Sequence, residues 1–256
     1  MPILTGSDLQ HIYSRAKRSV RKKAAEAKAP LYYILDGVRY CEQVVQIDND
    51  QGQISVPGKE PESLTSRTRP EMFVFAGCNG AGKTTLIDHF EYDFDGIVNA
   101  DVIAQKLNPE NPRNVDLSAG KKALLELRAM VEERKTFAVE TTLTGNYILK
   151  QIKVAKTMGY NVYLYFIGLA DTELHINRVH TRVIEGGHFI SSEDIVRRYH
   201  SSLNNLAAAV TLADASVIID NSGDEYVTVA EIVSGRMQWR ANRLPQWMSE
   251  VNLEFI

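Results

Sequence analysis

The chain has few cysteines and no long apolar run. Cys41 and Cys78 are the only cysteines among its 256 residues, and their spacing matches no metal-binding pattern. So few cysteines favour a reducing compartment, which makes a Cys41–Cys78 disulfide the disfavoured alternative. The apolar runs are too short and interrupted to span a bilayer, and the first ten residues lack the basic-then-apolar order of a secretion signal. We therefore expect a cytoplasmic protein with no membrane partner.

A large net charge is also lacking. The 29 Lys and Arg residues are nearly balanced by 32 Asp and Glu residues. With a net charge of −3, the protein as a whole is not expected to bind nucleic acid electrostatically. Basic residues do gather between Arg15 and Lys28, in a segment whose pattern predicts a helix over residues 1–30 that ends at Pro30. A solvated helix face and a contact with an acidic partner or nucleic acid both fit this segment.

The following residues predict a small module of hairpins and then a linker. Two apolar segments, 31–35 and 38–41, flank Asp36-Gly37, which is a strong signal for a two-residue hairpin turn. Residues 44–47 and 53–56 predict two further short strands. The segment 57–70 holds three of the eight prolines and almost no apolar residues, so it predicts a linker. Residues 1–56 are therefore predicted to be a helix-and-hairpin module tethered to the rest of the chain.

From residue 71 onward, predicted strands and helices alternate. Their apolar strands suit a parallel sheet that is covered by helices on both faces. The fold class is therefore α/β, with a P-loop kinase-like domain over residues 71–256. Strands are expected at 72–76, 96–99, 137–140, 161–168 and 216–220, helices at 83–91, 102–107, 117–134, 146–158, 171–184 and 192–212, and an edge hairpin at 226–233 and 237–240.

A glycine-rich motif follows the first of these strands and opens a helix. It satisfies the pattern G-x-x-x-x-G-K-[ST] in the context that a phosphate-binding loop requires. Its glycines allow consecutive N–H groups to turn toward an anion, and the helix adds its positive end. Lys83 is predicted to reach the β- and γ-phosphates, and Thr84 to ligate Mg²⁺. ATP and Mg²⁺ are thus the expected cofactors, with contacts from Gly77, Asn79, Gly80, Ala81, Gly82, Lys83, Thr84 and Thr85.

Other nucleotide-binding classes lack their own signatures in this sequence. The base-reading motif of GTPases and the signature helix of transporter ATPases are both missing. An apolar run does end in Asp220 and resembles a metal-binding strand, but we interpret Asp220 as a strand terminus near the nucleotide base. A kinase that acts on a small molecule remains.

Two carboxylates are predicted at the carboxyl ends of strands, where open α/β sheets place their active sites. Asp101 follows the second strand and Glu140 ends the third, so both should face the phosphate loop. A kinase needs such a group to accept or orient the acceptor proton. The structural alternatives are a helix N-cap for Asp101 and a hydrogen bond to neighbouring backbone for Glu140.

Arginines flank a glycine-rich segment after the fourth strand. Arg178 and Arg182 are four residues apart on one predicted helix face, and Arg197 and Arg198 follow the sequence Glu-Gly-Gly-His at 185–188. This pattern predicts a lid that closes over the phosphates and excludes water. Surface ion pairs with Glu193 and Asp194 are the alternative for any one arginine. His188 is predicted to pack in the lid or contact the substrate, while the other histidines belong to no visible constellation.

The motifs GCNGAGKTT, NAD before a helix, VETTLTG and RVHTRVIEGGHFISSEDIVRRY resemble, in this order, the zeta toxin kinases over about residues 71–222. This resemblance implies ATP-dependent phosphorylation of a hydroxyl on a sugar nucleotide, typically UDP-N-acetylglucosamine. Asp101 matches the catalytic base, and Lys83 and Thr84 match the nucleotide and metal contacts. Glu140 and Thr142 match substrate contacts, and the lid residues correspond to Arg178, Arg182, Arg197 and Arg198. The GGH lid departs from the better-known Gram-positive members.

Zeta-type kinases are commonly silenced by a small antitoxin, and residues 1–56 lie outside the resemblance. A tethered module could play this part within the chain, because a 14-residue linker gives an effective concentration on the order of mM. A stabilising appendage and a docking module are the alternatives. For the kinase itself, the alternatives are a housekeeping metabolite or nucleotide kinase and a nucleotide-dependent regulatory switch.

Overall fold

The computed structural model describes residues 30–35, 38–43, 69–90, 92, 94–187 and 189–251, and the first two of these ranges by backbone alone. The chain divides into two compact units, residues 1–68 with 90–93 and residues 69–89 with 94–256. The helix predicted at 1–30, the strands predicted at 44–47 and 53–56 and the lid residue His188 lie outside the described residues, as does nearly all of the predicted linker. Their predictions stay untested.

The first unit contains the predicted hairpin. Strand β1 (Pro30–Leu35) pairs antiparallel with β2 (Val38–Gln43), and Leu35 lies opposite Val38. This register leaves two residues for the connection, as the Asp-Gly pair predicts. The prediction of a hairpin at this place is confirmed.

The second unit is built on a seven-stranded sheet in the order β4-β5-β3-β6-β7-β8-β9. The first five strands in this order are parallel, and the last two pair antiparallel at one edge. The predicted fold class is therefore confirmed. The strands are β3 (Glu71–Ala76), β4 (Gly96–Asn99), β5 (Phe137–Thr141), β6 (Asn161–Gly168), β7 (Ala215–Asp220), β8 (Val227–Val233) and β9 (Arg236–Arg240).

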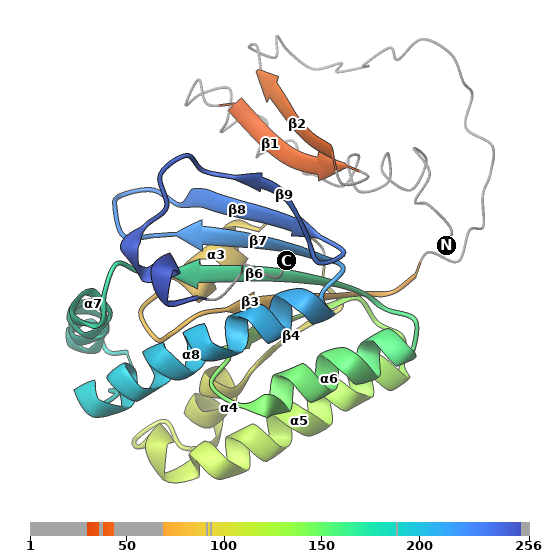
Figure 1. Cartoon of the computed structure of the whole chain (residues 1–256). Helices are drawn as coiled ribbons and strands as arrows, with labels where there is room; N and C mark the ends of the chain where they lie inside the picture. The colour runs from red at the N-terminus through yellow and green to blue at the C-terminus, as the bar shows by residue number, and fades with distance from the viewer. Residues whose placement is uncertain are drawn as a thin grey trace, which may run out of the picture. The chain divides into compact units, whose positions relative to one another are not determined.

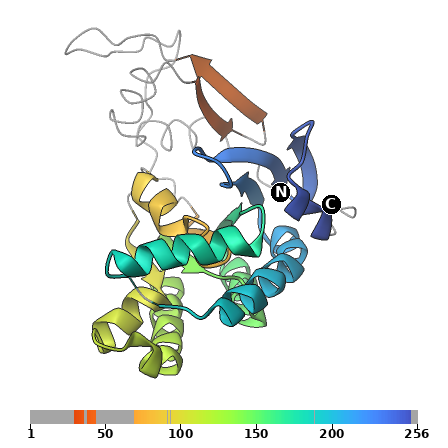
Figure 2. The ribbon, with the colours of Figure 1, turned by 90° about the vertical axis from the view of Figure 1, so that its left-hand side faces the viewer.

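Helices connect the parallel strands, and Figure 1 shows most of them on one side of the sheet. Helices α4, α5, α6 and α8 lie on that side, while α7 lies at the end of the sheet where the parallel strands finish, as Figure 2 also shows. None of the described helices is long and apolar enough to cross a membrane. The helices are α3 (Lys83–His89), α4 (Ala100–Leu107), α5 (Asp116–Glu132), α6 (Asn146–Thr157), α7 (Thr172–Ile184) and α8 (Ser192–Leu212), with 3₁₀ helices η1 (Pro112–Val115) and η2 (Gln246–Glu250).

Alternation along the central strands divides the core between the two faces of the sheet. Leu164 and Phe166 belong to the large core under the four helices, whereas Ile167 packs with Leu86 of α3 on the opposite face. Strand β6 is not fully buried, because Tyr163 and Tyr165 are partly exposed. These two rings lie on the face that carries the short helix α3, where Tyr165 stacks on Phe75 with ring centroids 5.2 Å apart.

Local signals explain the ends of several elements. Helix α4 begins two residues earlier than predicted because the Asn99 side chain accepts hydrogen bonds from the N–H groups of Asp101 and Val102. Asn99 is thus the N-cap, and the alternative role of Asp101 as a cap is wrong. The predicted edge hairpin is confirmed, with Ser234 (φ 50°) and Gly235 (φ 71°) in the left-handed conformation of a two-residue turn.

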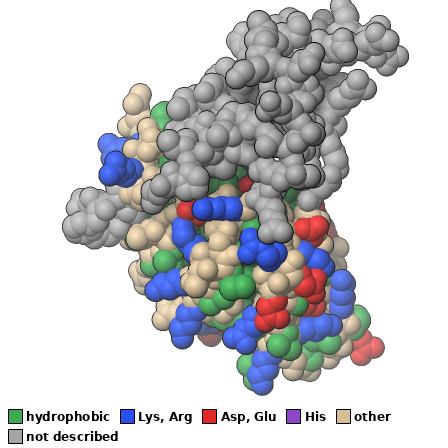
Figure 3. Space-filling model, turned by 90° about the vertical axis from the view of Figure 1, so that its right-hand side faces the viewer, with side chains coloured by type: hydrophobic (Ala, Val, Ile, Leu, Met, Phe, Trp, Pro, Cys, Tyr) green, Lys and Arg blue, Asp and Glu red, His purple; other side chains and the backbone are tan. Residues whose placement is uncertain are grey.

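The described surface is mixed in charge. On the face drawn in Figure 3, Lys and Arg side chains are interspersed with Asp and Glu side chains and with apolar ones. This agrees with the near balance of charges in the sequence.

Candidate active site

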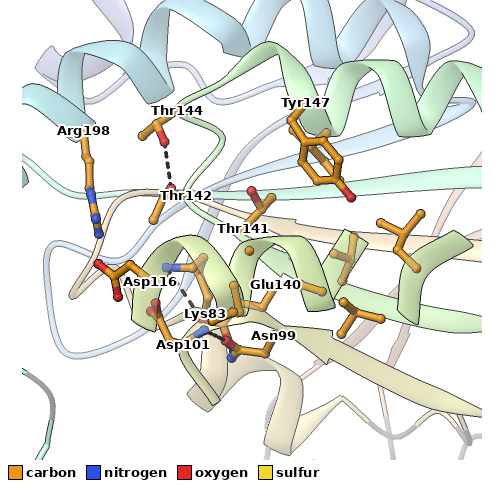
Figure 4. A pocket seen from close by; sticks show the side chains of 18 of the residues that line it. Lys83, Asn99, Asp101, Asp116, Glu140, Thr141, Thr142, Thr144, Tyr147 and Arg198 are labelled. Atoms are coloured by element: carbon orange, nitrogen blue, oxygen red, sulfur yellow. Dashed lines mark hydrogen bonds and ion pairs between the residues drawn. The ribbon is translucent and has the colours of Figure 1, made fainter. Parts of the chain in front are cut away.

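A pocket of about 320 Å³ opens beside the glycine-rich loop, at the carboxyl ends of β4 and β5. Figure 4 shows Lys83, Asn99 and Glu140 together in it, with Asp101 and Asp116 beside them. The predicted site residues Lys83, Asp101, Glu140, Thr142, Arg197 and Arg198 all line this pocket, and the remaining wall is formed by Val98, Asn99, Ala100, Asp116, Ala119, Gly120, Ala123, Leu127, Val139, Thr141, Thr144, Tyr147 and Ile148.

Gly77 and Gly82 show why the loop after β3 requires glycine. Gly77 has φ 141°, and a Cβ there would lie 2.2 Å from the backbone oxygen of Ile167 on β6. Gly82 has φ 97°, and a Cβ would meet the side chains of Asn221 and Tyr226 at 2.6 and 2.7 Å. Only glycine combines positive φ with such close approach. The loop therefore has the tight backbone that the motif predicts.

Lys83 is the first residue of α3, and its side chain is buried in the pocket floor. Its Nζ donates to the backbone oxygen of Cys78 at 3.1 Å and lies 3.7 Å from Glu140 Oε1. The other carboxylate oxygen of Glu140 accepts hydrogen bonds from Thr84 Oγ1 (2.9 Å) and Asn99 Nδ2 (2.7 Å). The alternative role of Glu140, a hydrogen bond to neighbouring backbone, is wrong. Its partners are side chains of the phosphate loop and of β4.

The residues around Thr84 fit the needs of a magnesium ion. Mg²⁺ bound to a nucleotide takes only one or two ligands from the protein, because phosphates and water supply the rest. The Thr84 hydroxyl and the Glu140 carboxylate are 2.9 Å apart, so two hard oxygen donors meet where the motif predicts the ion. Within the described residues no cluster of three acidic, histidine or cysteine side chains forms a metal site. A Mg²⁺ ion that binds together with the nucleotide does not need such a cluster.

Asp101 lies in the first turn of α4, and its side chain is exposed to the pocket. Its N–H donates to Asn99, which fixes the backbone that carries it. No side chain in the described ranges hydrogen-bonds to its carboxylate. The carboxylate is thus held in position by its backbone while its oxygens stay open to an incoming hydroxyl.

Arg197 and Arg198 approach the pocket from α8. Arg198 Nη1 donates to the side-chain oxygen of Asn79 at 2.9 Å, so a buried residue of the phosphate loop orients this arginine. Arg197 Nη2 donates to Asp194 at 2.8 Å, which is the ion pair considered from the sequence. The structure thus brings both arginines to the pocket, one tied to the loop and one to its own helix.

The other two predicted arginines lie on α7 and do not line the pocket. Arg178 Nη2 donates to the backbone oxygen of Gly223 at 3.4 Å, and its Cβ lies close to Gly80 of the phosphate loop. Arg182 packs under Gly187, where a Cβ would meet Arg182 atoms at 2.7 and 2.8 Å. The pair therefore borders the nucleotide loop and the turn after α7. Contacts of these arginines with phosphates stay a prediction.

His175 of α7 is a buried residue of the site that the sequence did not reveal. Its Nδ1 lies 2.7 Å from the backbone oxygen of Asn79, and because that oxygen can only accept, the ring donates from Nδ1. Burial lowers the pKa of His175 to about 4, so the ring is neutral at physiological pH. His175 thus holds the loop residue whose side chain orients Arg198.

The depressed pKa of His175 makes stability dependent on pH. The unfolded chain binds this proton with a pKa near 6.5 and the folded chain only near 4, so stability is complete above pH 6.5 and falls as the pH drops toward 4. We expect the free energy of unfolding to fall by about 3 kcal/mol over this range through His175. Denaturant unfolding at pH 7.5 and 4.5 measures it. His175→Asn, which keeps a donor at the same place, should show a smaller loss.

The exposed His180 on the same helix provides the control. His180→Asn should retain the pH dependence of the native chain. An equal loss of stability in the native chain and in His175→Asn would show that the buried ring does not titrate as its environment predicts.

The loop after β7 supports the phosphate loop from the other side. Asn221 Nδ2 donates to the backbone oxygen of Ala81 at 2.8 Å, and the hydroxyl of Tyr226 donates to that of Gly82 at 2.8 Å. Asp220 accepts hydrogen bonds from Trp247 Nε1 (2.8 Å) and Ser222 Oγ (2.6 Å). Asp220 therefore anchors the C-terminal segment, consistent with its interpretation as a strand terminus.

One wall of the pocket comes from helix α5, most of which the sequence analysis did not connect with the site. Asp116, Ala119, Gly120, Ala123 and Leu127 follow helical spacing along α5, so they share one face. This face is polar at its start and apolar farther along, and its small residues leave room for a ligand. The spacing alone could have grouped these residues, but only the fold shows that they face β4 and β5.

A glycine-rich phosphate loop on a parallel α/β sheet, with a carboxylate-lined pocket at the strand ends, is typical of P-loop phosphotransferases. The chain belongs to the Zeta toxin family, whose model matches residues 57–230. Membership of this family implies an ATP-dependent kinase, and it confirms the resemblance seen in the sequence motifs.

Three known proteins are similar to this chain. An uncharacterized protein of Haemophilus influenzae is 37% identical over 125 residues, which make up 49% of this chain and 89% of that protein. The structure of AvrRxo1-ORF1:-ORF2 with ATP superposes with a TM-score of 0.54 at 18% identity. The match covers 68% of this chain and 61% of the other, so this chain spans about three fifths of the length of that protein. The PezAT toxin–antitoxin system of Streptococcus pneumoniae gives a TM-score of 0.49 at 20% identity, over 66% of this chain and 74% of the other.

Proposed function

We propose that this protein is a cytoplasmic kinase that transfers the γ-phosphoryl group of ATP to a hydroxyl of a sugar nucleotide such as UDP-N-acetylglucosamine. The observation that carries the proposal is the shared pocket of Lys83 and Asp101. One is the cation of the phosphate loop and the other is an open carboxylate in the same pocket. A phosphoryl group and an acceptor hydroxyl can meet between them.

The residues of the pocket divide the work of phosphoryl transfer. Asp101 accepts or orients the proton of the attacking hydroxyl, while Lys83 and Arg198 stabilise charge on the transferring group. Glu140 holds Lys83 and the Thr84 hydroxyl in place through its two oxygens. A bound Mg²⁺ ion supplies further neutralisation of the phosphates, with Thr84 as its ligand from the loop.

The shape of the pocket supports an acceptor with a polar and an apolar part. Thr142, whose hydroxyl lies 3.1 Å from that of Thr144, and Asp116 offer hydrogen bonds to sugar hydroxyls. The apolar stretch of α5 from Ala119 to Leu127 and the ring of Tyr147 suit an N-acyl group or a planar base. A sugar nucleotide with an N-acyl sugar has both parts.

The direct test is incubation of the purified chain with labelled ATP, Mg²⁺ and UDP-N-acetylglucosamine, followed by mass analysis of the phosphorylated product. Lys83→Ala is the inactive control. Phosphorylation of another metabolite from a small-molecule extract would indicate a metabolite or nucleotide kinase. Acceptor-independent nucleotide turnover would indicate a regulatory switch, for which Asp101 has no role.

We further propose that the N-terminal unit restrains the kinase within the same chain. Its support is that residues 1–68, together with residues 90–93, group into a unit distinct from the kinase unit. The linker predicted at residues 57–70 would keep the effective concentration of the module on the order of mM. Bacterial growth should be inhibited more by residues 71–256 than by the full chain, and Lys83→Ala should abolish the inhibition. Equal growth with the two active forms would contradict restraint by this unit.

A further inference from the structure

Four charged side chains connect η1 and the start of α5 with the start of α8. Arg113 Nη1 donates to Asp116 Oδ2 at 2.9 Å, and Arg113 Nη2 donates to Asp194 Oδ2. The other oxygen of Asp194 accepts from Arg197 Nη2 at 2.8 Å. The result is a continuous chain in the order Asp116, Arg113, Asp194, Arg197.

The two ends of this chain line the acceptor pocket, and the two middle members do not. Asp116 belongs to the α5 wall and Arg197 to the α8 wall. The middle side chains are the better covered, with 29% of Arg113 and 26% of Asp194 exposed against 64% of Arg197. The network therefore joins the α5 and α8 walls of the pocket through two residues that do not line it.

Single ion pairs at a surface contribute little, but this network differs in its geometry. One planar guanidinium uses separate nitrogens to bind two carboxylates from different helices, so fixing Arg113 fixes both carboxylates. Hydrogen bonds from Arg197 and Arg113 lower the pKa of Asp194 to about 2, so Asp194 stays charged over the physiological range. Asp194 also lies in the first turn of α8, where a negative charge is favourable.

We propose that Arg113 is a positioning residue that sets the distance and orientation of the two walls of the acceptor pocket. It holds Asp116 directly and holds Arg197 through Asp194. In its absence, Arg197 and Asp116 each regain the rotamer freedom of exposed side chains, and the acceptor must order them when it binds. The inference rests on the proposed kinase function of this pocket.

Steady-state phosphorylation of UDP-N-acetylglucosamine at saturating ATP tests the effect on the reaction. Arg113→Gln should lower kcat/KM for the acceptor by about tenfold and leave KM for ATP within about twofold. Arg113→Lys, which keeps the charge but loses the two-pronged geometry, should recover only part of the loss. Lys135→Gln, which removes the exposed ion pair with Glu133 (2.6 Å) away from the pocket, is the matched control and should have native activity.

A double-mutant cycle separates positioning from a general structural effect. If Arg113 acts partly through Arg197, then Arg113→Gln should lower kcat/KM by clearly less than about tenfold in an Arg197→Gln background, because only its direct hold on Asp116 is then lost. A full tenfold loss in that background would overturn the proposed route.

Hydrogen exchange gives a readout that needs no acceptor. In the free protein, amides of residues 195–200 should exchange about tenfold faster in Arg113→Gln than in the native chain or Lys135→Gln. Unchanged exchange would overturn the proposal even if the native chain phosphorylates UDP-N-acetylglucosamine. Faster exchange together with no phosphorylation of that acceptor would uphold the network and reject the proposed acceptor.

Discussion

Replacing Asp101 by Asn should lower phosphoryl transfer by about 10³-fold while ATP binds with unchanged affinity. The change keeps the size of the side chain and the backbone N–H that donates to Asn99, so α4 should retain its cap. It removes only the carboxylate that accepts or orients the acceptor proton. Single-turnover phosphorylation of UDP-N-acetylglucosamine measures the transfer, and titration with a fluorescent ATP analogue measures nucleotide binding.

Asp88 offers a matched control, because it is an exposed aspartate on the neighbouring helix α3 and does not line the pocket. Asp88→Asn should transfer phosphate at the native rate. Native turnover by Asp101→Asn would remove Asp101 from the mechanism and leave the pocket without an identified base.

Replacing Glu140 by Gln should have two large effects. The native carboxylate pairs with the buried Lys83 and accepts a hydrogen bond from Thr84, so the change leaves a buried cation without its anionic partner. We expect the free energy of unfolding of the nucleotide-free protein to fall by about 3 kcal/mol. Turnover should fall by about 10²-fold because Lys83 and Thr84 lose their alignment.

Chemical denaturation and steady-state kinetics measure these two effects. Glu133→Gln is the control, since Glu133 forms an exposed ion pair with Lys135 and its side chain is 57% exposed. That variant should stay within about 0.5 kcal/mol of native stability. If Glu140→Gln matched Glu133→Gln in both measurements, the carboxylate could not be the organiser of the phosphate loop.

The elements of the second unit were predictable because their signals are local. Turn residues and apolar runs lie next to one another in the sequence, so β6 and the hairpin of β8 and β9 were found at almost the observed bounds. The phosphate loop was predictable for the same reason, since its glycines, Lys83 and Thr84 are contiguous. Strand-end placement also predicted that Asp101 and Glu140 share the pocket.

The partners of these residues were not predictable, because they come from distant parts of the chain. Glu140 meets Asn99 across 41 residues, and Arg113 meets Asp194 across 81. Neither residue type nor spacing selects such a pair before the strands and helices are placed. His175 shows the same limit, since a histidine on a helix reveals nothing of the carbonyl that it meets 96 residues earlier.

The C-terminal segment has a consequence for how far the catalytic unit extends. The family match ends at residue 230, but Trp247 is buried against Phe166 and donates a hydrogen bond to Asp220. The next residue, Asn221, donates a hydrogen bond to the backbone oxygen of Ala81 in the phosphate loop. A chain cut at residue 230 would keep every motif residue. It would lose Trp247, which anchors Asp220 beside the asparagine that supports the phosphate loop. The segment needed to support the phosphate loop therefore extends beyond the residues that carry the family motifs, to at least Trp247.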